Sequence, residues 1–278
     1  MLKENLKKNI GITTRTFMQP ILNGKITSEK LMKWAAGLGF QWIEIRDNGC
    51  EMSKAYLMGL KELGKSLGIN LHYAWDGSDL LKTGDEELFK RGIDNAVIFG
   101  EGTFSRITIA GSAMKSVQSQ RGYLKEDFGS LCKIIKKYNE FASSKKICIV
   151  YENSLESVAG DGVTYFGMRE LMQTNGDMKM TFDPGNFLNR DQEKKLPTWD
   201  QVKEFYIEFK DRIPYIHLKS TKDNILTDNL VMDGDIDIRG LVCMASEKDI
   251  ICIELPAQDE LSVCYNNVEE ALKDLLSI

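Results

Sequence analysis

Short apolar runs recur along the chain and alternate with segments of helical periodicity. The runs are rich in isoleucine and valine with few polar interruptions, which is typical of strands buried on both faces of a parallel sheet. They comprise residues 9–14, 42–46, 69–75, 105–110, 146–152, 178–183, 214–219 and 249–255. The pattern therefore predicts parallel strands joined by crossover helices.

The segments between the runs carry apolar residues at helical spacing. In residues 28–40 the apolar positions 31, 34, 35 and 38 lie on one helical face. Residues 53–69 repeat this spacing and end near Gly68, a residue suited to a left-handed helix cap. Thr198 and Gln201 have the spacing of a capping box. We therefore predict an α/β fold, a single (β/α)8 TIM barrel that forms one domain over residues 1–278.

Length and composition agree with this prediction and exclude several classes of protein. A chain of 278 residues accommodates one barrel, and 42% apolar residues provide a core. The net charge of −5 argues against a nucleic-acid partner, because phosphate binding needs a basic face. Apolar stretches are too short to span a membrane, and the charged start lacks the apolar part of a signal peptide. Six cysteines without a CxxC pair indicate reduced thiols, so we expect a cytoplasmic protein.

Four acidic or imidazole residues end four of the later runs. Glu152, Asp183, His217 and Glu254 follow one another at gaps of 31, 34 and 37 residues. Each gap is about the length of one strand, one crossover helix and their loops. If these strands are neighbours in a barrel, the four side chains converge at its C-terminal mouth. Three carboxylates and one imidazole are suitable ligands for a divalent metal ion.

The segments around these positions resemble the metal-binding strand ends of the xylose-isomerase-like TIM barrels. They read YEN at 151–153, TFDPGN at 181–186, IHLKS at 216–220 and CIELP at 252–256. That superfamily includes sugar isomerases, ketose 3-epimerases and inosose dehydratases. The resemblance implies that Glu152, Asp183, His217 and Glu254 bind one divalent ion, which is Mn²⁺, Mg²⁺, Co²⁺ or Zn²⁺.

The resemblance also implies a sugar isomerase or epimerase that acts on a small carbohydrate. Proton removal next to a carbonyl builds charge on oxygen as an enediolate, which a divalent ion stabilises. In the epimerases of this superfamily the two metal-binding glutamates move the proton, so the expected catalytic residues are Glu152 and Glu254. The chain departs from the epimerase pattern at Asn186, where those enzymes usually have histidine. It departs again at Ser220, where many relatives have aspartate.

Other functions remain open at this stage. A metal-dependent lyase or dehydratase would use the same ligands to expel a β-leaving group from a keto-sugar, keto-glycoside or inosose. A sugar-binding barrel without activity is a further alternative, although a binding protein has no need of a basic glutamate pair. The abasic-DNA repair branch is disfavoured, because its three-zinc site needs many histidines and this chain has only His72 and His217.

Further candidates lie near the expected mouth. His72, in the third run, is either a catalytic base or a hydrogen-bonded wall residue. Glu44 and Arg46 either bind sugar hydroxyls or pair with each other as part of the scaffold. Trp75 either forms a wall for the apolar faces of a sugar or packs in the core.

Two more residues are candidates for substrate binding. Asn186 could donate a hydrogen bond to a sugar hydroxyl, and Lys219 could carry substrate charge or be a solvated lysine. Residues 111–125 are polar and aperiodic, so they predict a long loop after the fourth strand that either closes over the site or stays at the surface. The sequence leaves homo-oligomerisation open.

Overall fold

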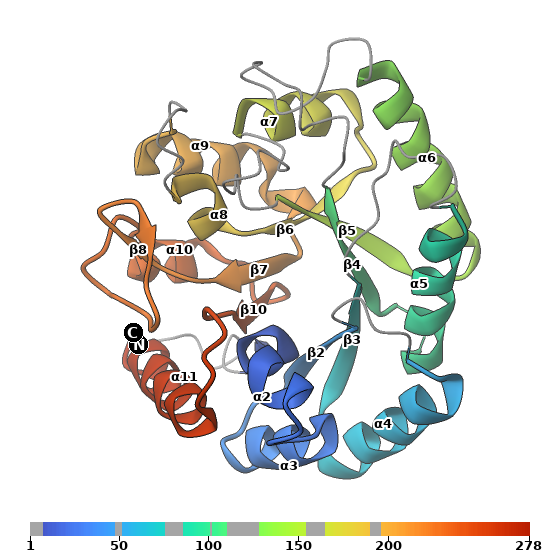
Figure 1. Ribbon diagram of the computed structural model, residues 1–278. Helices are drawn as coiled ribbons and strands as arrows, with labels where there is room; N and C mark the ends of the chain where they lie inside the picture. Colours follow the sequence, from blue (N-terminus) through green and yellow to red (C-terminus); the bar gives the residue numbers. More distant parts are fainter. Residues whose placement is uncertain are drawn as a thin grey trace.

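Parallel strands form the centre of the protein and close into a barrel in the order β1-β10-β7-β6-β5-β4-β3-β2. The computed structural model describes residues 8–47, 52–75, 86–100, 102–109, 128–153, 165–189 and 196–278. Figure 1 shows the strands at the centre with helices around them. The barrel strands are β1 (Ile10–Thr13), β2 (Trp42–Arg46), β3 (Asn70–Trp75), β4 (Phe104–Ile109), β5 (Cys148–Asn153), β6 (Lys179–Phe182), β7 (Tyr215–Leu218) and β10 (Ile250–Ile253).

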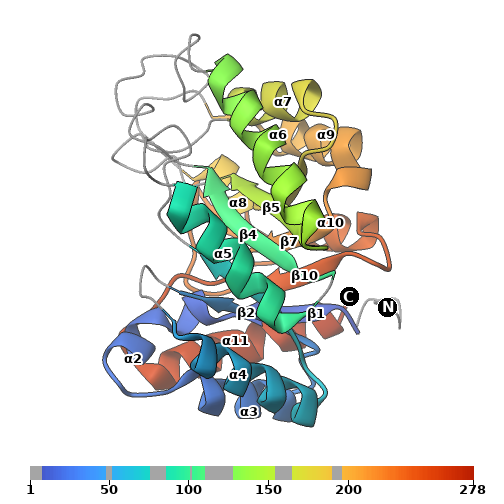
Figure 2. The same cartoon turned by 90° about the vertical axis from the view of Figure 1, so that its right-hand side faces the viewer.

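Helices cover the outside of the barrel, as the views in Figures 1 and 2 both show. Among the described residues, none of them combines the length and apolarity that crossing a membrane requires. The larger helices are α3 (Ser28–Gly37), α4 (Lys54–Leu67), α5 (Glu86–Phe99), α6 (Phe128–Ser144), α7 (Tyr165–Thr174), α9 (Trp199–Phe209) and α11 (Leu261–Leu276). The shorter ones are η1 (Thr14–Phe17), α2 (Met18–Leu22), α8 (Pro184–Leu188), η3 (Lys210–Arg212) and α10 (Ile238–Met244).

The predicted TIM-type α/β fold is confirmed, and every predicted apolar run overlaps one barrel strand. Gly68 caps α4 in the left-handed conformation with φ 71°, and Thr198 and Gln201 form the predicted capping box at α9. The expected regular alternation of strands and helices is interrupted between β7 and β10. There the chain first forms a small antiparallel hairpin of β8 (Thr221–Lys222) and β9 (Ile225–Leu226) before α10. The predicted loop at 111–125 lies outside the described residues.

Side chains of the barrel strands alternate between the helices and the barrel interior. Ile43 and Ile45 of β2 belong to the main apolar core with residues of the helices. The alternate residues of the same strand, Trp42, Glu44 and Arg46, lie on its opposite face, which points into the barrel. Trp42 packs there against a second, smaller apolar cluster of Tyr215, Ile250 and Cys252. The interior is therefore apolar towards the start of these strands and charged towards their C-terminal ends.

Helix α5 packs so closely on β3 that one of its residues must be glycine. A Cβ atom added to Gly92 would come within 2.7 Å of the Trp75 ring. Trp75 is buried, and its ring also lies 5.4 Å from the ring of Phe89 on the same helix. A rigid indole held between a strand and a helix cannot move aside at little cost.

We predict that Gly92→Ala destabilises the protein, whereas Gly59→Ala stabilises it. Both glycines lie inside helices, where alanine is favoured by about 0.5–1 kcal/mol. At Gly59 an added Cβ would meet no described atom within 4 Å, so this gain is kept. At Gly92 the overlap with Trp75 should cost about 1–3 kcal/mol of folding stability, so the substitution should lower the stability there. Urea denaturation of both variants measures the difference, and equal stability would refute the close packing of Trp75 on α5.

Candidate functional site

The C-terminal ends of the barrel strands bring acidic residues from distant parts of the chain together. Glu44 lies on β2, Glu152 on β5 and His217 on β7. Asp183 directly follows β6, and Glu254 directly follows β10. In a parallel barrel these ends open at one mouth, where catalytic groups of this fold collect.

Glu152, Asp183, His217 and Glu254 form one buried cluster. Each offers one ligand atom, and these atoms all lie within 4.8 Å of one another. Two ligands of one ion, each about 2.0–2.6 Å from it, lie at most about 5.2 Å apart. The separation of the four ligand atoms is therefore compatible with a shared ion.

The His217 ring connects the cluster to a carboxylate behind it. Its Nδ1 atom lies 2.8 Å from Glu152 Oε1 and 2.7 Å from Glu254 Oε2. Its Nε2 atom lies 2.9 Å from Glu44 Oε2. Nδ1 thus faces two of the other ligand candidates, Glu152 and Glu254, and Nε2 faces Glu44.

Two buried cations lie against the acidic groups. Arg46 Nη1 is 3.3 Å from Glu254 Oε1, and Arg46 Nη2 is 3.8 Å from Glu152 Oε2. Lys219 Nζ is 2.8 Å from Asp183 Oδ2 and 3.2 Å from Glu254 Oε1. Glu254 therefore touches both cations, which connect three of the four ligand candidates.

Two asparagines hold the ends of β5 and β6 together. Asn153 Nδ2 donates to the Asp183 carbonyl at 2.7 Å, and the Asp183 N–H donates to Asn153 Oδ1 at 3.0 Å. Asn186 Nδ2 donates to the Asn153 carbonyl at 2.8 Å, and its Oδ1 accepts from Lys219 Nζ at 3.2 Å. Asp183 also caps the short helix α8, because its Oδ1 accepts from the Asn186 N–H. These bonds keep Asp183 in one orientation.

Burial and neighbouring charges shift the pKa values in this cluster in different directions. Burial raises the pKa of Asp183 to about 7; the Lys219 charge opposes this, and Glu152 and Glu254 add to it. Burial alone would lower the pKa of His217, but the charges of Glu254, Glu44 and Glu152 hold it well above its usual value. Burial alone would raise the pKa of Glu254, but Lys219, His217 and Arg46 hold it well below its usual range.

The charges of these groups suit a divalent cation. With every carboxylate ionised and His217 neutral, the two cations leave two negative charges uncompensated. The pKa values of Asp183 and His217 are both raised, so protons on these two groups reduce this excess of negative charge. A divalent ion would provide two positive charges, and hard oxygen donors with one imidazole suit Mn²⁺, Mg²⁺, Co²⁺ or Zn²⁺. The four buried carboxylates in this balance are Glu44, Glu152, Asp183 and Glu254, and the two buried cations are Arg46 and Lys219.

Two of the residues expected to bind substrate, Glu44 and Trp75, are buried in contacts with the protein. Glu44 is fully buried behind His217, where it accepts hydrogen bonds from Thr13 and Tyr215. Its burial and these protein contacts favour the scaffold alternative over binding of sugar hydroxyls. Trp75 points outward from β3 and packs against α5, so its position favours core packing over a sugar-binding wall. The strand period explains this, because Trp75 and the inward-facing His72 are three residues apart.

His72 lies in the barrel interior at the depth of Glu44, with which it is in register on the neighbouring strand. Its ring stacks on Trp42 at 4.5 Å and meets Tyr215 edge-on at 5.2 Å. Burial lowers the pKa of His72 to about 3, although the Glu44 charge opposes this. A neutral imidazole below the cluster is a weak base, so its position favours the interpretation as a wall residue.

The remaining substrate candidates are near the cluster but already have protein partners. Arg46 and Lys219 are buried ion-pair partners of the acidic groups. They are therefore not solvated charges. Asn186 donates to Asn153 and accepts from Lys219, so its first role is to hold the site together. The sequence did not identify Thr13, Tyr215 and Asn153 as residues that hold the site. Of these three, only Asn153 lies in a segment that the resemblance had singled out, directly after Glu152.

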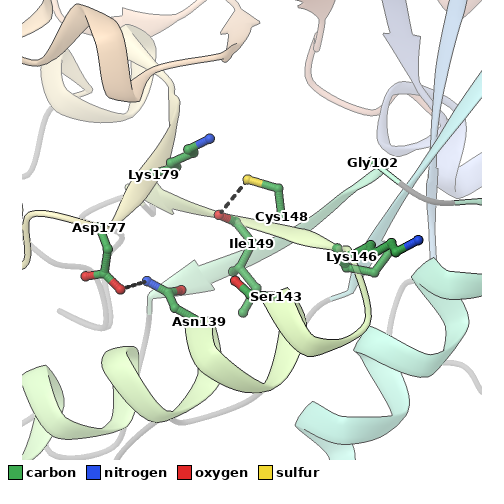
Figure 3. Close-up of a pocket in the computed structure, with 9 residues that line it drawn as sticks. Gly102, Asn139, Ser143, Lys146, Cys148, Ile149, Asp177 and Lys179 are labelled. Carbon is green, nitrogen blue, oxygen red and sulfur yellow. Dashed lines mark hydrogen bonds between the residues drawn. The ribbon is translucent and has the colours of Figure 1, made fainter.

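A pocket of about 330 Å³ lies at the other end of the barrel. It opens beside the N-terminal ends of β5 and β6, with Cys148 and Lys179 from these strands and Asn139 and Ser143 from α6 (Figure 3). Its polar side chains include Asp177, which accepts a hydrogen bond from Asn139. None of the candidate residues lines it, and this end of a TIM barrel contributes mainly to stability.

Comparison with known proteins finds relatives by structure only. No family model and no curated protein sequence matches the chain. A D-allulose 3-epimerase from Methylomonas sp. superposes with a TM-score of 0.69 and 14% identity over 97% of each chain. A xylose isomerase-like TIM barrel protein from Mycobacterium smegmatis, in complex with magnesium, has a TM-score of 0.64 and 16% identity, over 90% of this chain and 88% of that one.

The structural neighbours share the fold and differ in their reactions. An AP endonuclease of family 2 from Brucella melitensis also superposes, with a TM-score of 0.64 and 9% identity, over 90% of this chain and 93% of that one. Identities this low show the fold alone. The resemblance to xylose-isomerase-like TIM barrels is therefore confirmed as a likeness of fold, and the reaction must be argued from the site.

We predict that Mn²⁺ stabilises the protein against heat. A ligand that binds only the native state at 100 times its Kd contributes about 2.7 kcal/mol, which corresponds to about 5–10 °C for a chain of this size. Scanning calorimetry with Mn²⁺ and then with a chelator measures the shift. Asp183→Ala should lose most of it, whereas Asp259→Ala, at an exposed aspartate outside the cluster, should keep it. An equal shift in the Asp183 variant would refute the site.

We also predict that Mn²⁺ affinity falls as the pH is lowered from 8 to 6. The ion must displace protons, and the raised pKa values of His217 and Asp183 mean that protons compete better at lower pH. Each proton released should weaken binding by about tenfold per pH unit. Titration calorimetry in buffers of different ionisation enthalpy counts these protons. Affinity that is constant from pH 8 to 6 would contradict the charge balance, and Asp183→Asn should reduce the proton count at pH 6.

Proposed function

We propose that this protein is a divalent-metal-dependent sugar isomerase or epimerase that moves a proton next to a carbonyl group. The observation that supports this most is the buried cluster of Glu152, Asp183, His217 and Glu254, whose ligand atoms lie within 4.8 Å of one another. The likeness of fold to a D-allulose 3-epimerase agrees with it. The substrate proposed is a small carbohydrate with a carbonyl group.

The metal ligands proposed are the four residues of the cluster. A divalent ion bound there would act as a Lewis acid that stabilises the negative charge of an enediolate. Asp183 is held for this role by Asn153 and by the first turn of α8. His217 presents Nδ1 to the cluster, because Glu44 holds its other nitrogen.

Glu152 and Glu254 are the proposed acid–base pair. They come from β5 and from the end of β10, and each has one oxygen within 2.8 Å of His217 Nδ1. Two carboxylates at one carbon can remove a proton and return it, which is the requirement of an epimerase or isomerase. His72 is not assigned this role, because its ring is packed between Trp42 and Tyr215.

Arg46 and Lys219 are proposed to assist both steps. Their charges stabilise the ionised form of Glu254, which each of them contacts at 3.2–3.3 Å. The same charges would favour the oxyanion that forms as the proton leaves. Burial makes this effect larger than it would be at a solvated surface.

The test is a screen of ketoses, inososes and 3-keto-glycosides with Mn²⁺ in deuterated water. Deuterium incorporation next to the carbonyl, with or without net isomerisation, would support the proposal. Loss of a leaving group from the same carbon skeleton would support the lyase or dehydratase alternative. Metal binding without exchange for any of these substrates would count against both enzyme functions and favour the sugar-binding alternative.

We predict that Glu254→Gln separates metal binding from catalysis. The amide keeps an oxygen ligand and the shape but removes the base, so Mn²⁺ should still bind, more weakly, while deuterium exchange falls by about 10²-fold or more. His217→Ala should lose Mn²⁺ first, because it removes the nitrogen ligand. Glu270→Gln, at an exposed site on α11, is the control. Exchange at the unaltered rate in Glu254→Gln would leave Glu254 as a ligand only and assign the base to Glu152.

A further inference from the structure

Glu44 is held by several hydrogen-bond partners inside the barrel. It has no exposed surface. Its Oε1 accepts a hydrogen bond from the Thr13 hydroxyl at 2.9 Å. Its Oε2 accepts one from the Tyr215 hydroxyl at 3.0 Å and lies 2.9 Å from His217 Nε2. Thr13 lies on β1, and Tyr215 and His217 both lie on β7. The carboxylate of Glu44 on β2 is therefore held by two other strands.

These contacts determine which nitrogen of His217 would keep its hydrogen when a metal ion binds. An ionised carboxylate only accepts hydrogen bonds. The nitrogen that faces Glu44 must therefore be Nε2–H, because a bare nitrogen at 2.9 Å would repel the carboxylate oxygen. Nδ1 lies equally close to the carboxylates of Glu152 and Glu254, so its hydrogen is the one that a divalent ion shared with these two carboxylates would displace.

We propose that Glu44 is a positioning residue that fixes the orientation and tautomer of His217 and thereby sets the metal affinity of the site. This inference rests on the metal site of the proposed function. A carboxylate behind a ligating imidazole raises the basicity of the ligand and prevents ring rotation. Glu44 acts through His217 and has no contact with substrate, which agrees with its complete burial.

The position of Glu44 opposes a purely structural role. A carboxylate that only joined strands could do so from any inner position, whereas Glu44 lies directly against the imidazole of the cluster. Its burial is costly unless its charge is used, because a buried ionised group needs partners that compensate its lost hydration. Here two hydroxyl donors and the imidazole provide that compensation. The charge of Glu44 then polarises the imidazole towards the cluster.

The first experiment compares Glu44→Gln with Tyr215→Phe. The glutamine keeps the size of the side chain and removes its charge, whereas the phenylalanine removes one hydrogen bond to Glu44 and leaves the charge. Titration calorimetry with Mn²⁺ alone should show affinity about 10–100-fold weaker in Glu44→Gln and a clearly smaller loss in Tyr215→Phe. Equal losses in the two variants, or unaltered affinity in Glu44→Gln, would overturn the proposal.

The second experiment reads the tautomer in the unmodified protein. The chain has two histidines, so ¹⁵N spectra of its imidazoles contain two rings, and the ring that responds to Zn²⁺ is His217. We expect Nδ1 to be the metal-bound nitrogen and Nε2 to carry a slowly exchanging hydrogen. A Zn²⁺-loaded His217 with a bare Nε2 would overturn the proposal even if Glu44→Gln failed to fold.

The outcomes separate this inference from the proposed function. If the unmodified protein binds no divalent ion, both fail. If it binds Mn²⁺ and Glu44→Gln binds it equally well, only the role of Glu44 fails. If Glu44→Gln binds Mn²⁺ weakly and no carbohydrate exchanges deuterium, the role of Glu44 stands and the isomerase or epimerase function fails.

Discussion

The buried charge balance around His217 is the constraint on which the rest of this site depends. Four carboxylates meet inside the barrel, and the described residues set two permanent cations against them. Such a group of like charges is stable only with further positive charge, because hydration is lost on burial. The raised pKa values of His217 and Asp183 mean that protons provide part of it, and a divalent ion would provide it in the proposed enzyme. The arrangement of these side chains by the fold therefore favours a cation at this site.

The barrel arranges this cluster in layers. Trp42, Tyr215 and Cys252 fill the interior below, and Glu44 and His72 form the next level in register on β2 and β3. The proposed ligands lie at the C-terminal ends above them. Asn153 joins β5 to β6 there through paired hydrogen bonds with Asp183. A ligand set held in this way needs little rearrangement when an ion binds, which favours both affinity and catalysis.

The fold by itself leaves the chemistry undecided. The same barrel is found in a D-allulose 3-epimerase and in an AP endonuclease, so function must follow from the side chains at the mouth. Here a glutamate pair shares one imidazole, and Arg46 and Lys219 contact the same carboxylate. Groups placed in this way suit the proposed proton transfer, because a divalent ion held by these residues would supply a Lewis acid beside the base and its counter-charge.

The sequence by itself determined the strands and the four proposed ligands. Each strand is marked by its own apolar run, and each proposed ligand is found in the sequence at or near the end of such a run. The depth of each inner side chain was decided only by the tertiary structure. Glu44 and Arg46 are two residues apart on β2, yet Glu44 lies behind His217 and Arg46 lies beside Glu254. Strand period predicts which face a residue occupies, whereas its layer depends on the stagger of neighbouring strands. Contacts such as Tyr215 with Glu44, 171 residues apart, arise from that stagger and have no local signal.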